Sequence, residues 1–461
     1  MTKSSKNSMN VNDPKLLFEN ALTLLDRNSN SPEALTECLE SIVKPLADDG
    51  YAPAQNFLGL MYYHGLGVDQ DYAEAVNCYQ PAAEQGFAES QNNLGLMYLN
   101  GLGVDQDYAE ALKWIRHAVN QGYGPAQNNL GFIYLEGLGV AQDYIEAVKW
   151  YQLAAEQGLA ESQTNLGLMY KDGLGVAEDY IEAAKWFHLA AKEGYVEAQA
   201  NLGLMYKDGL GVAQDYIEAA KWFHLAADQG SVDAQTHLGH IYFNGLGVAQ
   251  NYAEAMNWCK LAAEQGIAES QYALGLMYAN GLGVPQDFVE AATWYRHSAD
   301  QGFAESQYCL GLIYDNGHGV HQNYAEAAKW YRLAAKQGHA QSQYNLASIY
   351  RNGLGVAQDY VEAVKWLRRA ADQGLDVAQN NLASMYFNGL GVTQDLGEAV
   401  KWFTRAANQG CSIAQANLEA LYEDGCGVVR DLGEAVKWYQ LAADQGLEAP
   451  IDALEQLQKD N

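Results

Sequence analysis

The chain has 461 residues, of which 49% are hydrophobic and 18% are charged, so it can bury a sizeable core. Lys and Arg total 27 against 57 Asp and Glu, which gives a formal net charge of −30 at pH 7. A surface this negative repels phosphate backbones and anionic lipid, so the composition argues against nucleic acid and membrane surfaces as partners and leaves a basic ligand open.

The N-terminal segment MTKSSKNSMNVNDPK contains lysines with no apolar run behind them, which argues against a secretory signal peptide. We expect residues 1–12 to be polar and disordered. No stretch approaches the roughly 18 consecutive apolar residues of a membrane-spanning helix. The six cysteines are irregularly spaced, at Cys38, Cys78, Cys259, Cys309, Cys411 and Cys426. This spacing favours reduced thiols over a disulfide framework and, for an unprocessed chain, predicts a cytoplasmic protein.

A 36-residue repeat covers most of the chain. Cutting the sequence every 36 residues from Tyr51 gives eleven blocks that end at Gly446, and we number the columns of a block from 1 to 36. In all eleven blocks, column 5 is Gln, column 8 is Leu, column 12 is Tyr, columns 15, 17 and 36 are Gly, column 18 is Val, and columns 24–25 are Glu-Ala. All ten Trp lie in column 28. Such repetition predicts units that each contact only their neighbours.

Each block predicts two helices. Columns 2–14 have apolar or small residues at helical spacing, and the glycine at column 15 suits the left-handed end of a helix. Column 21 is Asp or Asn with Glu three residues later, which predicts the N-cap of a second helix that runs to the glycine at column 36. Small residues at columns 9, 25 and 32 let the two helices approach closely, and we expect columns 12, 28 and 29 to fill the space around them.

The pattern AxxQxxLGxxYxxGxGVxxDYxEAxKWYxxAAxxG resembles the Sel-one-like repeat, a relative of the tetratricopeptide repeat, over residues 51–446. This resemblance implies an all-α protein, an α-solenoid of stacked helix pairs that assembles other proteins. It also identifies residues 13–50 as a degenerate N-terminal capping repeat and 447–461 as a C-terminal capping helix. Ala347, Ala383 and Glu419 replace the column 9 glycine in the last three blocks, where we expect the helix spacing to loosen.

The sequence offers little for catalysis. The GLGV turn follows a helix rather than a strand, which argues against a dinucleotide site. Acidic pairs such as Asp179 and Glu182 recur in nearly every block and therefore indicate helix caps rather than one active site. No Ser/His/Asp or Cys/His arrangement stands out. We expect no enzymatic activity and no cofactor.

Two histidine pairs are candidate metal ligands. His237 and His240 lie three residues apart on a first helix, and His318 and His321 lie in one turn. Because a zinc site needs three or four ligands and no third is evident, we interpret them as surface histidines and expect no metal. Cysteine-rich relatives of the repeat family act on β-lactams, but this sequence lacks their cysteine pattern.

The variable columns indicate where a partner binds. By analogy with the tetratricopeptide superhelix, columns 3, 6, 10, 13 and 14 should face the concave groove. Aromatic residues and arginine dominate interface energies, and they gather between about residues 231 and 388. The predicted partner-binding residues are Tyr272, Tyr308, Tyr344, Phe243, Arg351, Phe387 and His240.

Alternatives stay open for this surface. The tyrosines of column 6 can equally be packing residues, and the acidic column 3 can be a solvated rim. We predict a monomeric, non-enzymatic scaffold that binds a protein or peptide. The main rival is a glycan-binding or envelope-polysaccharide assembly protein, because tyrosines also stack on sugars; a lactam-acting enzyme is a remoter one.

Overall fold

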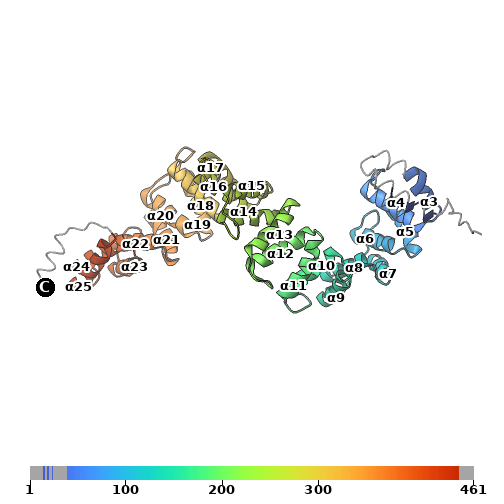
Figure 1. Cartoon of the computed structure of the whole chain (residues 1–461). Helices are drawn as coiled ribbons and strands as arrows, with labels where there is room; N and C mark the ends of the chain where they lie inside the picture. The colour runs from blue at the N-terminus through green and yellow to red at the C-terminus, as the bar shows by residue number, and fades with distance from the viewer. Residues whose placement is uncertain (1–13, 16–17, 20–22, 24–38, 446–461) are drawn as a thin grey trace, which may run out of the picture. The chain divides into compact units, whose positions relative to one another are not determined.

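The computed structural model describes residues 14–15, 18–19, 23 and 39–445, and within these it contains helices and no strand (Figure 1). The all-α prediction is confirmed. The chain divides into two compact units, residues 1–231 and 232–461, and each is described by itself. In both units, each 36-residue block is one helix hairpin. Within each unit, the first helix of a block packs on its own second helix and on the second helix of the block before it, which is the predicted solenoid arrangement.

The helices of the first unit are η1 (Leu39–Val43, a π-helix), α3 (Lys44–Asp48), α4 (Ala52–His64), α5 (Tyr72–Glu84), α6 (Ala88–Asn100), α7 (Tyr108–Val119), α8 (Gly124–Glu136), α9 (Tyr144–Ala155), α10 (Ala160–Asp172), α11 (Tyr180–Lys192), α12 (Val196–Asp208) and α13 (Tyr216–Asp228). Those of the second unit are α14 (Val232–Asn244), α15 (Tyr252–Glu264), α16 (Ala268–Asn280), α17 (Phe288–Asp300), α18 (Ala304–Asn316), α19 (Tyr324–Lys336), α20 (Ala340–Asn352), α21 (Tyr360–Asp372), α22 (Asp376–Asn388), α23 (Leu396–Asn408), α24 (Ser412–Asp424) and α25 (Leu432–Ala443).

Residues 39–50 cover the open end of the first hairpin. Leu39 and Val43 of η1 join Leu58 and Met61 of α4 in one buried cluster. Much of segment 13–50 is undescribed, so its identification as a degenerate capping repeat stays a prediction. The predicted polar segment 1–12 and the predicted closing helix 447–461 lie outside the described residues.

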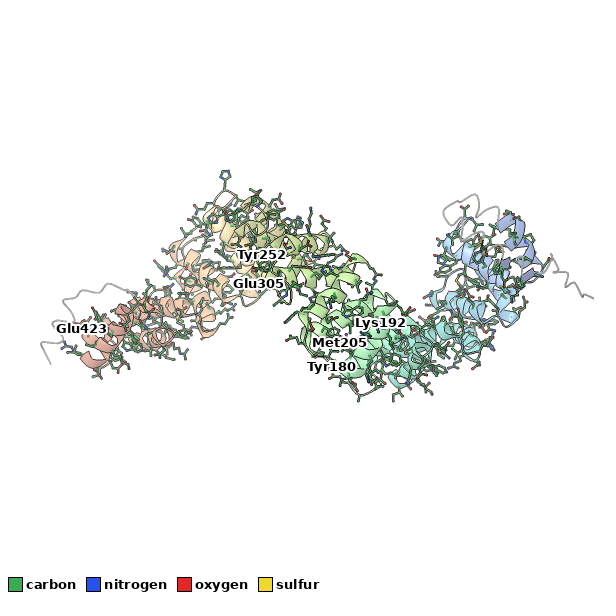
Figure 2. All side chains as sticks on the ribbon, in the orientation of Figure 1. Tyr180, Lys192, Met205, Tyr252, Glu305 and Glu423 are labelled. Carbon is green, nitrogen blue, oxygen red and sulfur yellow. The ribbon has the colours of Figure 1, made fainter. Side chains whose placement is uncertain are left out.

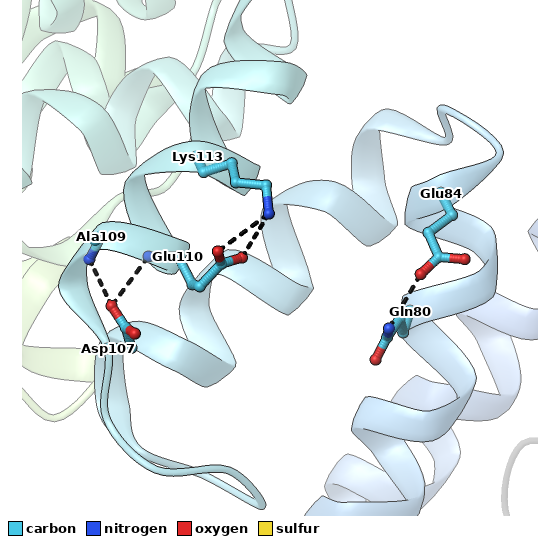
Figure 3. Close-up of polar contacts among 6 residues, drawn as sticks. All are labelled: Gln80, Glu84, Asp107, Ala109, Glu110 and Lys113. Carbon is cyan, nitrogen blue, oxygen red and sulfur yellow. Dashed lines mark hydrogen bonds and ion pairs between the residues drawn. The ribbon is translucent and has the colours of Figure 1, made fainter.

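The caps of the helices follow the sequence prediction with one difference. Asp107 begins α7, and its Oδ1 accepts hydrogen bonds from the backbone amides of Ala109 and Glu110 at 2.8 and 3.1 Å (Figure 3). Glu110 does not bond back to the cap amide, because its carboxylate pairs with Lys113 at 2.8 Å. The amide of Asp107 donates instead to the carbonyl of Tyr98, in column 12, at 2.9 Å. The cap therefore also ties the turn to the preceding helix.

The column 9 glycines allow a buried ring to lie against the first helix. A Cβ added at Gly203 would lie 2.7 Å from ring carbons of Phe223, in column 29, whose side chain is fully buried. In the last blocks, Ala347 and Ala383 occupy the glycine position and are themselves fully buried. The expected loosening of these hairpins is therefore wrong: α20 still packs on α21, and α22 on α23.

The tryptophans of column 28 join consecutive blocks. Trp222 is half-buried and packs against a core cluster that includes Phe187 of α11 and Leu202 of α12. Trp330 is only 4% exposed and belongs to a comparable cluster in the second unit, with Tyr295 of α17 and Leu310 of α18. The tryptophans of column 28 thus contribute to packing. The next residue, in column 29, is more deeply buried than the tryptophan in blocks such as that of Trp222 and Phe223.

The invariant glutamine of column 5 links three elements. The Gln91 side chain donates to the carbonyl of Ala83 in the preceding block at 3.0 Å and accepts from Gln121, in column 35, at 2.8 Å. This glutamine pair forms in ten blocks, at 2.8–3.0 Å. The block of residues 159–194 has Glu193 in column 35, and the buried Oε1 of Gln163 has no hydrogen-bond partner there. A carboxylate cannot donate the missing hydrogen bond.

Replacing Glu193 by Gln should therefore stabilise the chain. The new amide supplies the donor that the other blocks have, and satisfying one buried acceptor contributes about 1 kcal/mol. Urea unfolding followed by circular dichroism should show a higher midpoint for Glu193→Gln. As a matched control, Gln121→Glu should lower the midpoint by a similar amount, because it removes the same donor from Gln91. An unchanged midpoint in Glu193→Gln together with a lowered one in Gln121→Glu would contradict this interpretation.

A histidine caps helix α20. The Nδ1 atom of His339 accepts from the Ser342 amide at 3.2 Å, and its ring lies 4.7 Å from that of Tyr308. Burial lowers the pKa of His339, and the carboxylate of Glu305 partly opposes this shift. Because the pKa in the folded state lies below the unfolded value, the cap contributes stability above the unfolded pKa of about 6.5 and loses it as pH falls through the folded pKa.

The parent should therefore lose stability on acidification more steeply than His339→Asn, in which the cap remains but does not titrate. The difference in unfolding free energy between the two proteins should change by up to about 1 kcal/mol, the usual worth of an N-cap, between pH 8 and pH 5. Parallel urea titrations at several pH values measure it. A difference that stays constant with pH would show that His339 does not act through its protonation.

Candidate functional site

A hollow of about 430 Å³ opens between α14, α15 and α16 in the second unit. We call it the α14–α16 hollow. Its apolar wall is formed by Phe243, Cys259, Tyr272, Ala273, Leu276 and Phe303. Phe303 comes from the turn that precedes α18, and the other five come from the three named helices. The size is within the range of sites that bury a ligand group, about 300–1,000 Å³.

Polar groups lie along one side of the hollow. They are Thr236, His237, His240, Asn244, Glu269 and Ser270. His240, Asn244 and Glu269 are exposed, whereas Ser270 is buried. The hollow thus combines an apolar interior with an accessible polar edge that contains one carboxylate.

The rings around the hollow hold one another in place. The Tyr272 ring lies 5.4 Å from Phe303 and 6.0 Å from Tyr295, both at tilted angles. Phe243 makes an edge contact of 5.4 Å with Tyr252, at the start of α15. Tyr252 is labelled in Figure 2. Burial raises the pKa of the Tyr272 hydroxyl to about 12, so this group is neutral at physiological pH. Ring pairs of this kind stabilise by about 0.5–1.5 kcal/mol beyond the area that they bury.

The hollow lies at a block boundary that lacks one side-chain link. At five boundaries the side chain in column 6 accepts a hydrogen bond from column 7 of the next block, as Asn92 does from Asn129 at 2.8 Å and Asn380 does from Asn417 at 3.1 Å. Between α14 and α16 these two columns contain Thr236 and Ala273. Ala273 cannot donate the hydrogen bond that an asparagine in column 7 donates, and its side chain is smaller. The space that it leaves is lined by aromatic rings.

Three of the seven predicted partner-binding residues meet in this hollow. His240 and Phe243 reach it from α14, and Tyr272 reaches it from α16. The other four lie outside it, on α18, α20 and α22. Tyr308, Tyr344 and Phe387 are partly buried against the core cluster of the later blocks, and Arg351 is half-buried on α20.

The column 6 tyrosines alternate with column 1 residues of the following block. Tyr272 contacts Phe303, and Tyr308 contacts His339 at 4.7 Å between ring centroids. Tyr344 accepts a hydrogen bond from Asn381, which keeps the column 6 to column 7 link in a different form. These tyrosines therefore contribute to packing between blocks and also border the first-helix surface.

Sequence reasoning missed two contributors. Phe303 lies in column 1, which was not assigned to the surface, and Ala273 lies in column 7. The signal for Ala273 was present, because column 7 is Asn in seven blocks and departs from it at Phe57, His237, Ala273 and Cys309. The uniform assignment of column 6 to a groove was incomplete, since Asn56, Asn92 and Asn128 are buried in links between blocks.

A second apolar surface lies on the second helices of the first unit. Ile181 and Leu189 of α11 are 58% and 46% exposed, and Ile217 and Leu225 repeat them on α13. Lys185, which pairs with Glu182, stands between the two aliphatic residues on α11. A hollow of about 400 Å³ also opens beside this surface, next to Leu202 and Tyr206 of α12. The interleaved charges keep the apolar area in separate small pieces.

In the part of the chain that the structure describes, His, Cys, Asp and Glu nowhere gather in groups of three or more that could hold a metal ion. No described helix is both long and apolar enough to cross a bilayer. Cys78, Cys259, Cys309, Cys411 and Cys426 are free thiols.

The chain was compared with known families and structures. The Sel1 repeat family matches eleven consecutive segments, 52–87, 88–123, 124–159, 160–195, 196–231, 232–267, 268–303, 304–339, 340–375, 376–411 and 412–447. No match is found among curated proteins.

Two solved structures extend the comparison. That of c5321, described as a protective antigen present in uropathogenic Escherichia coli strains and displaying an SLR fold, is 38% identical and has a TM-score of 0.83, over 90% of this chain and 92% of its own. A Sel1 repeat protein from Oxalobacter formigenes is 33% identical with a TM-score of 0.54, over 72% of this chain and 93% of its own. With matched repeats through most of its length, the chain belongs to the Sel1 repeat family, whose members are generally scaffolds for protein interactions.

Proposed function

We propose that this chain is a non-enzymatic scaffold that binds a segment of a partner protein across the first helices of its second unit. The observation that carries the proposal is the α14–α16 hollow. There, Phe243, Tyr272 and Phe303 surround a space that no side chain of this protein fills. Aromatic pockets of this kind accept the anchor side chains that dominate interface energies. The family's general role as a scaffold supports the same interpretation.

The geometry favours a protein ligand over a glycan. A sugar stacks on a flat ring face that is open to solvent, whereas the Tyr272 and Phe303 rings pack against each other at 5.4 Å between centroids and are tilted by 49°. A single apolar side chain that enters the hollow would contact both rings. A monomeric state and a cytoplasmic location remain predictions of the sequence.

The test uses a triple variant that keeps the fold. Tyr272, Tyr308 and Tyr344 are each replaced by Asn, which is the residue of column 6 in four other blocks. The matched control carries Ala at Leu261, Val289 and Leu333, which are exposed apolar residues on second helices of the same unit. Both variants should stay folded, as circular dichroism can verify, and the tyrosine variant should melt somewhat below the control because it loses the ring contacts of Tyr272 and Tyr308.

Quantitative affinity capture from the native host should recover a partner with the parent and the control. Loss of a binding hot spot typically costs at least about 2 kcal/mol, or roughly thirtyfold in affinity, so the tyrosine variant should retain only a few per cent of that partner. Equal recovery by the parent and the tyrosine variant would contradict the proposal, and so would a loss that is confined to the second-helix control.

A further inference from the structure

The first helices around the hollow carry negative charge that no basic side chain on them offsets. The sequences of α14, α16 and α18 contain no Lys or Arg. Their first turns carry Asp233, Glu269 and Glu305, all exposed, in column 3 of three consecutive blocks. Glu305, on α18, is labelled in Figure 2. On the second helix α19, by contrast, Glu326 pairs with Lys329 at 3.5 Å.

These carboxylates lie beside the apolar opening. Glu269 itself lines the hollow, and Glu305 is close enough to Tyr272 to raise the pKa of its hydroxyl. Axes of packed helices lie about 8–10 Å apart, so a short extended segment laid across them reaches successive first turns. Acidic residues also suit the positive ends of helices, which explains their tolerance there but not the absence of Lys and Arg from α14, α16 and α18.

We infer that the partner segment is a basic peptide that places one large apolar side chain, an aromatic one in the simplest case, into the α14–α16 hollow. Lysine or arginine residues on either side of this anchor then face Glu269 and its neighbours in column 3. The formal net charge of −30 favours the approach of such a segment over any acidic one. This inference rests on the proposed function and specifies the chemistry of the partner.

The hollow can be closed with a residue that the fold already uses. Ala273→Asn places in column 7 the residue that seven other blocks have there, so the hairpin should keep its stability while the added amide occupies the space. Ala416→Asn is the matched control: it introduces the same side chain in column 6 of the last block, where other blocks also have Asn, and lies on α24, away from the hollow. Glu269→Gln removes the lining charge and keeps the shape.

Binding is measured by fluorescence anisotropy on the full chain with three dye-labelled nine-residue peptides. The first has one tryptophan flanked by lysines, the second has serine in place of the tryptophan, and the third has glutamates in place of the lysines. The first should bind best, with the serine peptide about thirtyfold weaker, as for a lost hot spot. The glutamate peptide should be at least about tenfold weaker in low salt, with a smaller gap near 0.5 M salt, because the screening length there is only a few ångströms.

Ala273→Asn should weaken the lysine–tryptophan peptide about as much as the loss of its tryptophan does, and Ala416→Asn should leave it unchanged. Glu269→Gln should weaken this peptide and not the glutamate one. Equal binding of the lysine and glutamate peptides would overturn the inference, as would equal binding of the tryptophan and serine peptides or an Ala273→Asn variant that binds like the parent. The absence of binding by every peptide would also overturn it, while partner capture that still depends on the column 6 tyrosines would leave the proposed function standing.

Discussion

Contact between neighbouring blocks is the interaction on which this structure depends. One hairpin of two short helices cannot bury its own apolar face, so each block is completed by the next. The glycine of column 9 lets the ring of column 29 lie against the first helix, and the tryptophan of column 28 spans consecutive blocks. The glutamine pair of columns 5 and 35 satisfies polar groups at the same boundary. Of these columns, column 5 is Gln in all eleven blocks, whereas columns 9, 28 and 35 each depart from their usual residue in one to three blocks.

The candidate site arises where that contact is relaxed. At five block boundaries, neighbouring first helices are joined through columns 6 and 7, either by an asparagine pair or by Tyr344 and Asn381. Thr236 and Ala273 cannot form this link, and an aromatic hollow takes its place. A repeat array can vary such a position with little loss of folding stability, because the remaining contacts at the same boundary still hold the blocks together. Column 6 thus joins blocks at some boundaries and lines the candidate site at another.

The sequence predicted most of the fold because its signals are local. Gly173 ends α10 in the left-handed conformation, and Asp179 caps α11 with its side chain, as the spacing indicated. It did not reveal which side chains meet between separate elements. The pairing of Gln121 with Gln91 and the orphaned oxygen of Gln163 depend on how the two helices of one block close. The contact of Tyr272 with Phe303 depends on how two hairpins stack. The sequence also did not decide whether the column 3 carboxylates form a solvated rim or part of a binding site, because it does not show which side chains lie next to them.

The account's central claim is that partner binding uses the first helices around the α14–α16 hollow and not the exposed second-helix surface. Hydrogen–deuterium exchange of the full chain, alone and saturated with its captured partner, tests this claim most directly. The account predicts added protection in the segments 232–244 and 268–280 and at the turn before α18, with little change in α9, α11 and α13. Protection centred on those second helices, with exchange at α14 and α16 unaltered, would contradict it.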